Sequence, residues 1–214
     1  IHHADALDWL ADPACLAGCS VVTSLPDWSE LPDLSLDEWL AWFARAATLI
    51  LTRVPDEGVA IFFQSDIRTG GVWIDKGAIV QRAAHALGIP LLFHTIVCRR
   101  PPGTVTYSRA SYAHMIGFSR GVRPEIGRST ADVIPDGGYK PGPKSMGVTA
   151  CRVACNFVLT ETTTRTIVDP FCGLGTVLAV GNQLGLDAIG VDLSARKCRR
   201  AQALDLDQIP EVQA

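Results

Sequence analysis

The stretch Thr166 to Asp192, TIVDPFCGLGTVLAVGNQLGLDAIGVD, decides the fold. A short apolar run, Ile167-Val168, ends in an acid, and a glycine-containing loop and a helical stretch then lead to a second apolar run that ends in Asp192. This order predicts a strand, a glycine loop, a helix and a second strand, which together make one β-α-β unit. Open α/β sheets bind ligands at the carboxyl ends of their strands, so the loop is expected to be a contact surface.

The spacing around the loop indicates the kind of ligand. Gly173 and Gly175 let the backbone pass close to a ligand where a side chain would clash. Asp192 follows Gly175 by 17 residues, where a carboxylate at a strand tip accepts hydrogen bonds from both ribose hydroxyls. A dinucleotide fingerprint needs a third glycine where this chain has Leu178, which disfavours NAD. A plain strand-to-helix turn is the alternative for a Gly-x-Gly loop alone.

The full string from Asp169 to Thr176, DPFCGLGT, is more specific. It resembles the D-P-F-x-G-x-G-T signature of S-adenosylmethionine-dependent methyltransferases, especially the amino-methyltransferases of nucleic acids. The resemblance implies S-adenosyl-L-methionine as the cofactor. The cofactor-binding residues that it implies are Asp5, Asp169, Phe171, Cys172, Gly173, Gly175, Thr176, Asp192 and Leu193.

The order of the motifs resembles a circularly permuted member of that family, because the cofactor unit comes last. The opening His3-Ala4-Asp5-Ala6-Leu7 is similar to the G-D-A-L opening of those enzymes, with Ala in place of Gly. By that resemblance Asp5 would hydrogen-bond the adenine amine of the cofactor. A simple helix cap is the alternative reading of Asp5.

A second candidate site follows the β-branched run Ser20–Thr23, which predicts a buried strand. This strand brings residues 24–28, SLPDW, to the same carboxyl edge as the glycine loop. The family carries [DNS]-P-P-[YFW] here, where the first side chain and a carbonyl accept the protons of a planar amine. Ser24 matches the first position and Pro26 the third, so the resemblance assigns both to catalysis.

The same segment departs from the family pattern at two positions. Leu25 replaces the first proline, and Asp27 replaces the aromatic residue that stacks on the base. Trp28 follows one residue later and is expected to take over the stacking. Asp27 is expected either to act as a general base toward a ring N–H or a hydroxyl, or simply to belong to a polar turn that closes the strand.

The periodicity of the remaining chain predicts an α/β fold. Together with the resemblance, it implies a Rossmann-like class I methyltransferase with a seven-stranded, mostly parallel sheet, one antiparallel strand near its edge and helices on both faces. The predicted strands are Ile1–Ala4, Ser20–Thr23, Val59–Phe63, Leu91–Cys98, Ser111–Ser119, Ile167–Val168 and Ala188–Val191. Ser35 and Glu38 form a capping box before an apolar stripe that runs to about Thr52, and residues 73–87 predict another helix. The aromatic residues of the first helix are expected to be core.

The length of 214 residues predicts one domain. Residues 1–121 would be its catalytic half, 122–146 a loop rich in Gly and Pro, and 147–214 its cofactor-binding half. No apolar run reaches the roughly 20 residues that span a bilayer, and no signal pattern opens the chain, which predicts a cytoplasmic protein. The seven cysteines are expected to be reduced and to bind no metal.

Net charge is −3, which excludes a polycation, but residues 97–128 hold six arginines against Glu125 alone. Guanidinium groups interleaved with tyrosines suit phosphate contacts and base stacking. Arg120 and Arg123 are the candidates for substrate contacts, and a solvated arginine face is the alternative.

The expected function is methyl transfer from S-adenosyl-L-methionine to a nucleic-acid base, in RNA such as tRNA or in DNA. Because some 25 loop residues are too few for a recognition domain, an unpaired or flipped-out base suits the chain best. The alternatives are a small-molecule methyltransferase and a catalytically silent cofactor-binding subunit. A homodimer or a partner subunit for recognition would be compatible with either kind of enzyme.

Overall fold

A central β-sheet organises the computed structural model, which describes residues 1–107, 109–125 and 131–206. Within these residues the sheet has eight strands in the order β1-β10-β9-β2-β3-β7-β6-β8. The strands are β1 (His2–His3), β2 (Cys19–Thr23), β3 (Ala60–Gln64), β6 (Leu91–Cys98), β7 (Tyr112–Phe118), β8 (Val133–Ile134), β9 (Thr166–Asp169) and β10 (Asp187–Asp192). Strand β7 runs antiparallel to both neighbours and the other pairings are parallel. The predicted fold class and the single antiparallel strand are therefore confirmed.

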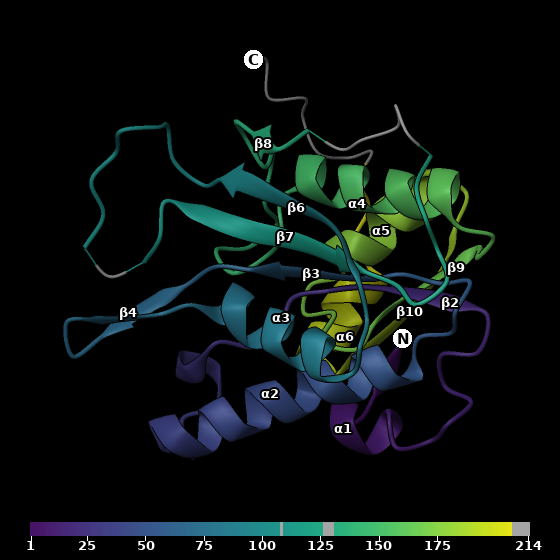
Figure 1. The fold of residues 1–214 in the computed structure, drawn as a ribbon, viewed down its shortest axis with the longest axis horizontal. Helices are drawn as coiled ribbons and strands as arrows, with labels where there is room; N and C mark the ends of the chain where they lie inside the picture. Colours follow the sequence, from purple (N-terminus) through teal and green to yellow (C-terminus); the bar gives the residue numbers. More distant parts are fainter. Residues whose placement is uncertain (108, 126–130, 207–214) are drawn as a thin grey trace.

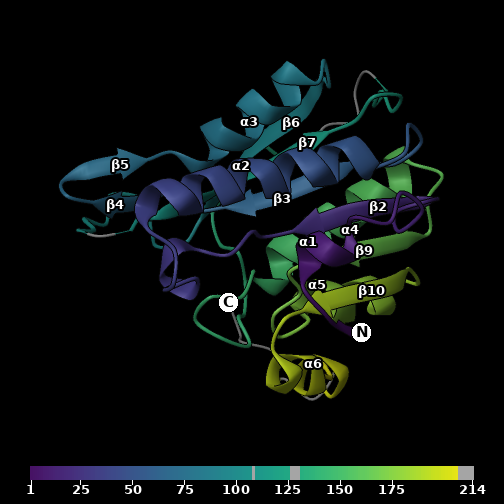
Figure 2. The same ribbon diagram turned by 90° about the horizontal axis from the view of Figure 1, so that it is seen from below.

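Helices cover both faces of the sheet (Figures 1 and 2). The helices are α1 (Ala6–Trp9), α2 (Leu36–Arg53), α3 (Lys76–Ala86), α4 (Val148–Glu161), α5 (Thr176–Gln183) and α6 (Ala195–Gln202). Figure 1 shows α2 and α3 below the sheet and α4 and α5 above it. Two apolar clusters follow this division, one built around Trp39, Phe43 and Phe62 and the other around Met115 and the buried side of α4. No helix in the described ranges is long and apolar enough to cross a membrane.

Helix α2 begins as predicted, at a capping box. Ser35 is the N-cap, its hydroxyl accepts a hydrogen bond from the Glu38 amide, and the Glu38 carboxylate accepts one from the Ser35 amide at 2.8 Å. The two side chains thus satisfy amides that have no partner within the helix. The helix ends at Arg53, one residue beyond the predicted end.

The strand count of seven was wrong, because the predicted loop 122–146 contains β8. Val133 and Ile134 pair with Ile96 and Val97 of β6, and the Ile96 amide donates to the Asp132 carbonyl at 2.8 Å. A strand of two residues has no periodicity for a sequence pattern to detect.

The predicted start of the helix at residue 73 was also wrong. Trp73 lies in a hairpin of β4 (Ile67–Thr69) and β5 (Val72–Ile74), and α3 begins only after its N-cap, Asp75. The hairpin turn is Gly70-Gly71, and both residues have positive φ, at 56° and 80°. Two adjacent glycines of this conformation are a strong hairpin signal that the apolar pattern concealed.

The direction of the strands defines two edges of the sheet. The carboxyl ends of β1, β10, β9, β2, β3 and β6 lie at one edge, because these strands are mutually parallel, and β7 ends at the opposite edge. At that opposite edge Arg120 donates to the Asp56 carboxylate and the Leu51 carbonyl, both at 2.8 Å, and to the Val54 carbonyl. Arg120 thereby ties the end of β7 to the C-terminal end of α2.

Arg120→Ala should lower the free energy of unfolding by about 1.5 to 3 kcal/mol, the range for hydrogen bonds to a charged group. Urea unfolding followed by circular dichroism measures this value, with the exposed Arg45→Ala of α2 as the control. Equal unfolding midpoints for Arg120→Ala and wild type would show that the guanidinium does not hold these elements together.

Candidate active site

A cavity of about 680 Å³ opens at the carboxyl edge of the sheet. It is lined by the first residues after β9, β10, β1 and β2, by the N-terminus of α5 and by residues 142–146. Parallel strands place their carboxyl ends together, so segments more than 140 residues apart meet there. The predicted site residues that line the cavity are Asp5, Ser24, Pro26, Asp169, Phe171, Cys172, Gly173, Thr176, Asp192 and Leu193.

The glycine loop has the backbone conformation expected from its sequence. Gly173 and Gly175 have φ of 54° and 79°, in the region that L-residues with side chains rarely adopt. Gly175 does not line the cavity, because it faces the other way. A Cβ atom on it would lie 2.8 Å from the Cβ of Ala201, so this glycine allows α6 to pack against the loop.

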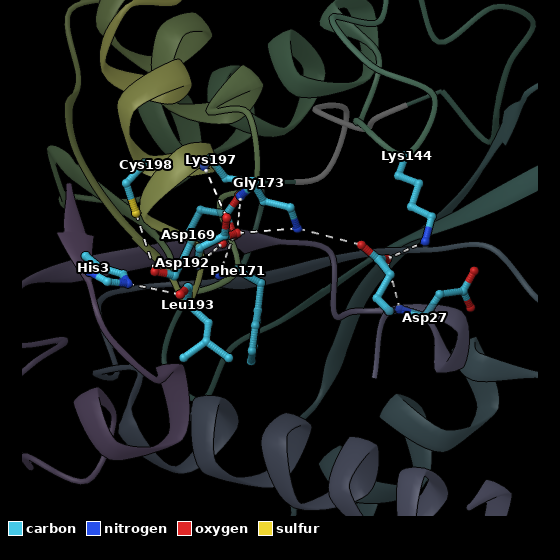
Figure 3. Close-up of polar contacts among 12 residues, drawn as sticks. His3, Asp27, Lys144, Asp169, Phe171, Gly173, Asp192, Leu193, Lys197 and Cys198 are labelled. Atoms are coloured by element: carbon cyan, nitrogen blue, oxygen red, sulfur yellow. Dashed lines mark hydrogen bonds and ion pairs between the residues drawn. The ribbon is translucent and has the colours of Figure 1, made fainter. Parts of the chain in front are cut away.

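Asp192 connects the loop to the tip of β10 (Figure 3). Its carboxylate accepts hydrogen bonds from the Gly173 amide at 3.0 Å and the Ser194 amide at 2.8 Å, and Lys197 Nζ lies 3.8 Å away. The carboxylate is fixed in direction by backbone donors while it lines the cavity. Such a group is suited to accept hydrogen bonds from a ligand's hydroxyls.

Asp169 is a second, more deeply buried acid at the end of β9. Its Oδ1 accepts a hydrogen bond from the Thr23 hydroxyl at 2.7 Å and from the Phe171 amide at 3.1 Å. Burial raises the pKa of Asp169 to about 7, and the nearby Asp192 carboxylate adds to the increase. The cavity therefore holds one carboxyl group that titrates close to neutral pH.

Asp169→Asn should become more stable relative to wild type as pH rises from about 5 to about 7.5. In that range the unfolded chain loses the Asp169 proton near its ordinary pKa of 3.8, whereas the folded chain keeps it until about 7. As pH rises, the free energy of unfolding of the wild type therefore falls through this group, whereas the Asn variant lacks the effect. Urea unfolding across the range measures the difference, with the exposed Asp132→Asn as control. A pH-independent difference would contradict the raised pKa.

Asp5 forms the cap of α1, accepting hydrogen bonds from the Leu7 amide at 2.7 Å and the Asp8 amide at 3.3 Å. The helix-cap reading is therefore correct. Asp5 also lines the cavity, so the same position remains available for the predicted contact with a ligand.

Ser24 and Pro26 reach the cavity, whereas Trp28 does not. The Trp28 indole donates to the Leu34 carbonyl at 2.9 Å and packs against the apolar cluster of α2. The expectation that Trp28 stacks on a base is not supported by this position. Trp42 of α2 lines the cavity instead, at 5.7 Å from the Phe171 ring in an edge-on arrangement. The sequence pattern predicts Trp42 in the core with Trp39, but only Trp39 is fully buried.

Asp27 points away from the cavity into a smaller adjoining pocket. Its carboxylate oxygens lie 2.9 Å from Lys76 Nζ and 3.3 Å from Arg109 Nη1. Asp27 does not line the cavity in which Ser24 and Pro26 lie, and its carboxylate already faces two cations. We therefore reject the general-base role and assign Asp27 to holding these cations.

Asp27→Ala should destabilise the protein by about 3 to 5 kcal/mol, because it leaves a buried ammonium without its partner. The Lys76 side chain is 3% exposed, and burial lowers its pKa in opposition to the attraction of Asp27. Adding Lys76→Met should restore most of the loss, as urea unfolding of the two variants will show. A double variant no more stable than Asp27→Ala would contradict the ion pair's structural role.

Arg120 and Arg123 lie at the opposite edge of the sheet, where they contact α2 and the residues after β7. This position corrects the expectation that they bind the acceptor. Arg99 and Arg109, which follow β6 and precede β7, line the pocket beside Asp27. The strands β6 and β7 pair antiparallel, so the residues that connect them and the residues that follow β7 lie at opposite edges of the sheet.

One group in the described residues could hold a metal ion by geometry, namely Asp66, Asp75 and His114. The His114 Nε2 atom already lies 3.1 Å from Asp66 and its Nδ1 lies 2.9 Å from His94 Nε2, so hydrogen bonds account for the group. Cys172 lines the cavity, but burial raises the pKa of its thiol strongly, so it stays protonated. Neither group indicates metal or thiolate chemistry at the cavity.

The fold matches solved structures. TTHA0409 of Thermus thermophilus, a candidate DNA modification methylase, has a TM-score of 0.73 at 19% identity over 99% of this chain and 97% of that one. A second structure of TTHA0409, complexed with S-adenosyl-L-methionine, gives 0.72 at 20% identity over 98% and 95%. PvuII DNA methyltransferase, which is cytosine-N4-specific, gives 0.71 at 15% identity over 100% and 87%. No family model and no curated protein matches the chain.

These similarities establish the fold: the chain has the Rossmann-like architecture of class I methyltransferases over nearly its whole length. At 15 to 20% identity the likeness is one of fold, and the chemistry depends on the side chains at the cavity.

Proposed function

We propose that the protein transfers a methyl group from S-adenosyl-L-methionine to a base of a nucleic acid. The proposal rests on one observation: the glycine loop, Asp192 and the Ser24–Pro26 segment line the same cavity. A cofactor loop and an acceptor segment that line one cavity are what transfer between two bound molecules requires.

The residues at the cavity suit S-adenosyl-L-methionine. The volume of about 680 Å³ lies within the usual range for ligands of this size. Asp192 offers a fixed carboxylate for the ribose hydroxyls, and Phe171 and Trp42 offer an apolar wall. Asp169 offers a buried carboxyl group that a cationic ligand would ionise, since a nearby positive charge favours the charged form.

When bound, the cofactor supplies a methyl group that is already activated as a sulfonium. The chain therefore has to position the acceptor and exclude water. Ser24 can accept a hydrogen bond from an amine that faces the cavity, while Pro26 fixes the turn and its carbonyl is held by Trp39 Nε1 at 3.3 Å. Because an amine can lose its proton after transfer, no general base is required in this arrangement.

Two projecting segments support a nucleic-acid acceptor. The β4–β5 hairpin and residues 99–107, which follow β6, extend from the same side of the molecule (Figure 1), and Ile67 bridges to Arg109. Trp73 is 47% exposed with the Arg68 guanidinium 5.9 Å from its ring, and Tyr107 is 83% exposed. Exposed aromatics and arginines beside an acceptor site suit base stacking and phosphate contacts.

The similar structures favour DNA as the nucleic acid, because TTHA0409 is described as a candidate DNA modification methylase and the PvuII enzyme as a DNA methyltransferase. RNA remains an acceptor to be tested beside it. Seven free cysteines suit a reducing compartment such as the cytoplasm. A partner subunit that recognises sequence would fit an enzyme whose own projecting segments are this short.

The direct test is incubation with methyl-labelled S-adenosyl-L-methionine and unmethylated single-stranded DNA, double-stranded DNA or RNA, followed by mass spectrometry of the nucleosides. A single labelled nucleoside is expected. Label that appears only in small molecules from an added cell extract would show that the acceptor is a small molecule and not a nucleic acid. Cofactor binding without any methyl transfer would indicate a catalytically silent subunit.

Asp192→Ala should weaken S-adenosyl-L-methionine binding by about 1.5 to 3 kcal/mol, the contribution of a charge-assisted hydrogen bond. Isothermal titration calorimetry measures the affinity. Asp187→Ala, at the exposed start of the same strand, is the matched control and should bind like wild type. Equal affinities for the two variants would remove Asp192 from the cofactor site.

A further inference from the structure

A small pocket of about 40 Å³ adjoins the main cavity, and the proposed function does not account for it. The two share Ser24, Leu25, Glu30, Lys144 and Ser145, so the pocket opens beside the proposed acceptor position. A single water needs about 10 to 15 Å³ by this measure, so the pocket admits a small oxyanion and excludes a base.

The pocket carries an excess of positive charge. Its cationic side chains are Lys76, Arg99, Arg109 and Lys144, and its carboxylates are Asp27 and Glu30. Each carboxylate is shared between two cations: Asp27 pairs with Lys76 and Arg109, and Glu30 lies 3.7 Å from Lys144 and 3.8 Å from Lys197.

Arg99 is the most informative member of this group. Its guanidinium is half-buried and donates to the Ser65 hydroxyl at 2.8 Å. In the ranges that the structure describes, no carboxylate lies within ion-pair distance of it. Burial lowers the pKa of Arg99, and repulsion from Arg109 lowers it further. A half-buried guanidinium that lies beside another arginine and has no carboxylate at ion-pair distance is stabilised when an anion binds to it.

We propose that this pocket is an oxyanion subsite in which Arg99 and Arg109 bind a phosphate group of the acceptor, next to the base held at Ser24. This subsite rests on the proposed function. It means that the enzyme binds its target through a phosphate group close to the base that is methylated. Asp27 keeps Lys76 and Arg109 in place, which explains why an acid occupies the position where the resembling family has an aromatic residue. The phosphate belongs either to a nucleic-acid backbone or to a phosphorylated small molecule.

The test uses Arg99→Gln and Arg109→Gln, with Arg82→Gln on the exposed side of α3 as the matched control. Unfolding midpoints and S-adenosyl-L-methionine affinity, which depends on the main cavity, establish that each variant is folded. The first probe is inorganic phosphate, compared with sodium chloride at equal ionic strength. Phosphate should raise the melting temperature of wild type and of Arg82→Gln. The increase should be clearly smaller for the two pocket variants.

The second probe is a short single-stranded oligonucleotide, as DNA and as RNA, titrated at several salt concentrations. Each pocket variant should reduce the salt slope by about 0.7, the value for one phosphate contact on a single strand. Loss of the phosphate effect together with these lower slopes supports a nucleic-acid phosphate in the pocket.

The remaining outcomes separate the two proposals. If phosphate stabilises wild type through Arg99 but no oligonucleotide binds, the subsite stands, the anion comes from a small acceptor and the nucleic-acid function fails. If oligonucleotides bind and all variants match wild type with both probes, the subsite is overturned while the proposed function remains.

Discussion

The parallel pairing of β2 with β9 is the contact on which the rest of the structure depends. It pairs residues 19–21 with residues 166–168 and so joins the N-terminal and C-terminal halves of the chain in one sheet. A hydrogen bond of 2.7 Å from Thr23 to Asp169 closes the pairing at the carboxyl edge, and buried hydroxyls of Ser20 and Thr164 close it at the other, also at 2.7 Å. The acceptor segment follows β2 and the glycine loop follows β9, so the register of this one pair sets how the two face each other across the cavity.

Charge divides the carboxyl edge into two regions. Two of the acids that line the main cavity, Asp169 and Asp192, are buried, whereas its cations Lys144, Arg196, Lys197 and Arg200 are partly or fully exposed. The buried pair of acids favours the cationic part of a ligand beside it. The adjoining pocket is cationic, because Arg99 and Arg109 exceed the charge that Asp27 can neutralise. A positively charged cofactor beside an anionic acceptor fits this division, and it gives each ligand a preferred side of the edge.

The local signals in the sequence predicted the fold and the backbone conformation of the glycine loop. The capping box at Ser35, the glycine loop and the acid at the end of β10 are all set by neighbouring residues, so a pattern reveals them. The acceptor side depends on tertiary packing. Only the packing of α3 against α2, β3 and β7 brings Lys76 to Asp27. Trp42 lies one position away from the buried stripe of Trp39 and Phe43. The strand β8 is too short to produce a pattern at all.

The binding of S-adenosyl-L-methionine at the carboxyl edge between β9, β10 and β2 is the step on which the proposed function depends. Hydrogen–deuterium exchange of the full chain, with and without the cofactor, tests this most directly. Protection is predicted for the amides of residues 169–176 and 192–194, with little change near Arg120 at the opposite edge. Protection centred on the opposite edge, or an exchange pattern unchanged by saturating cofactor, would contradict the account.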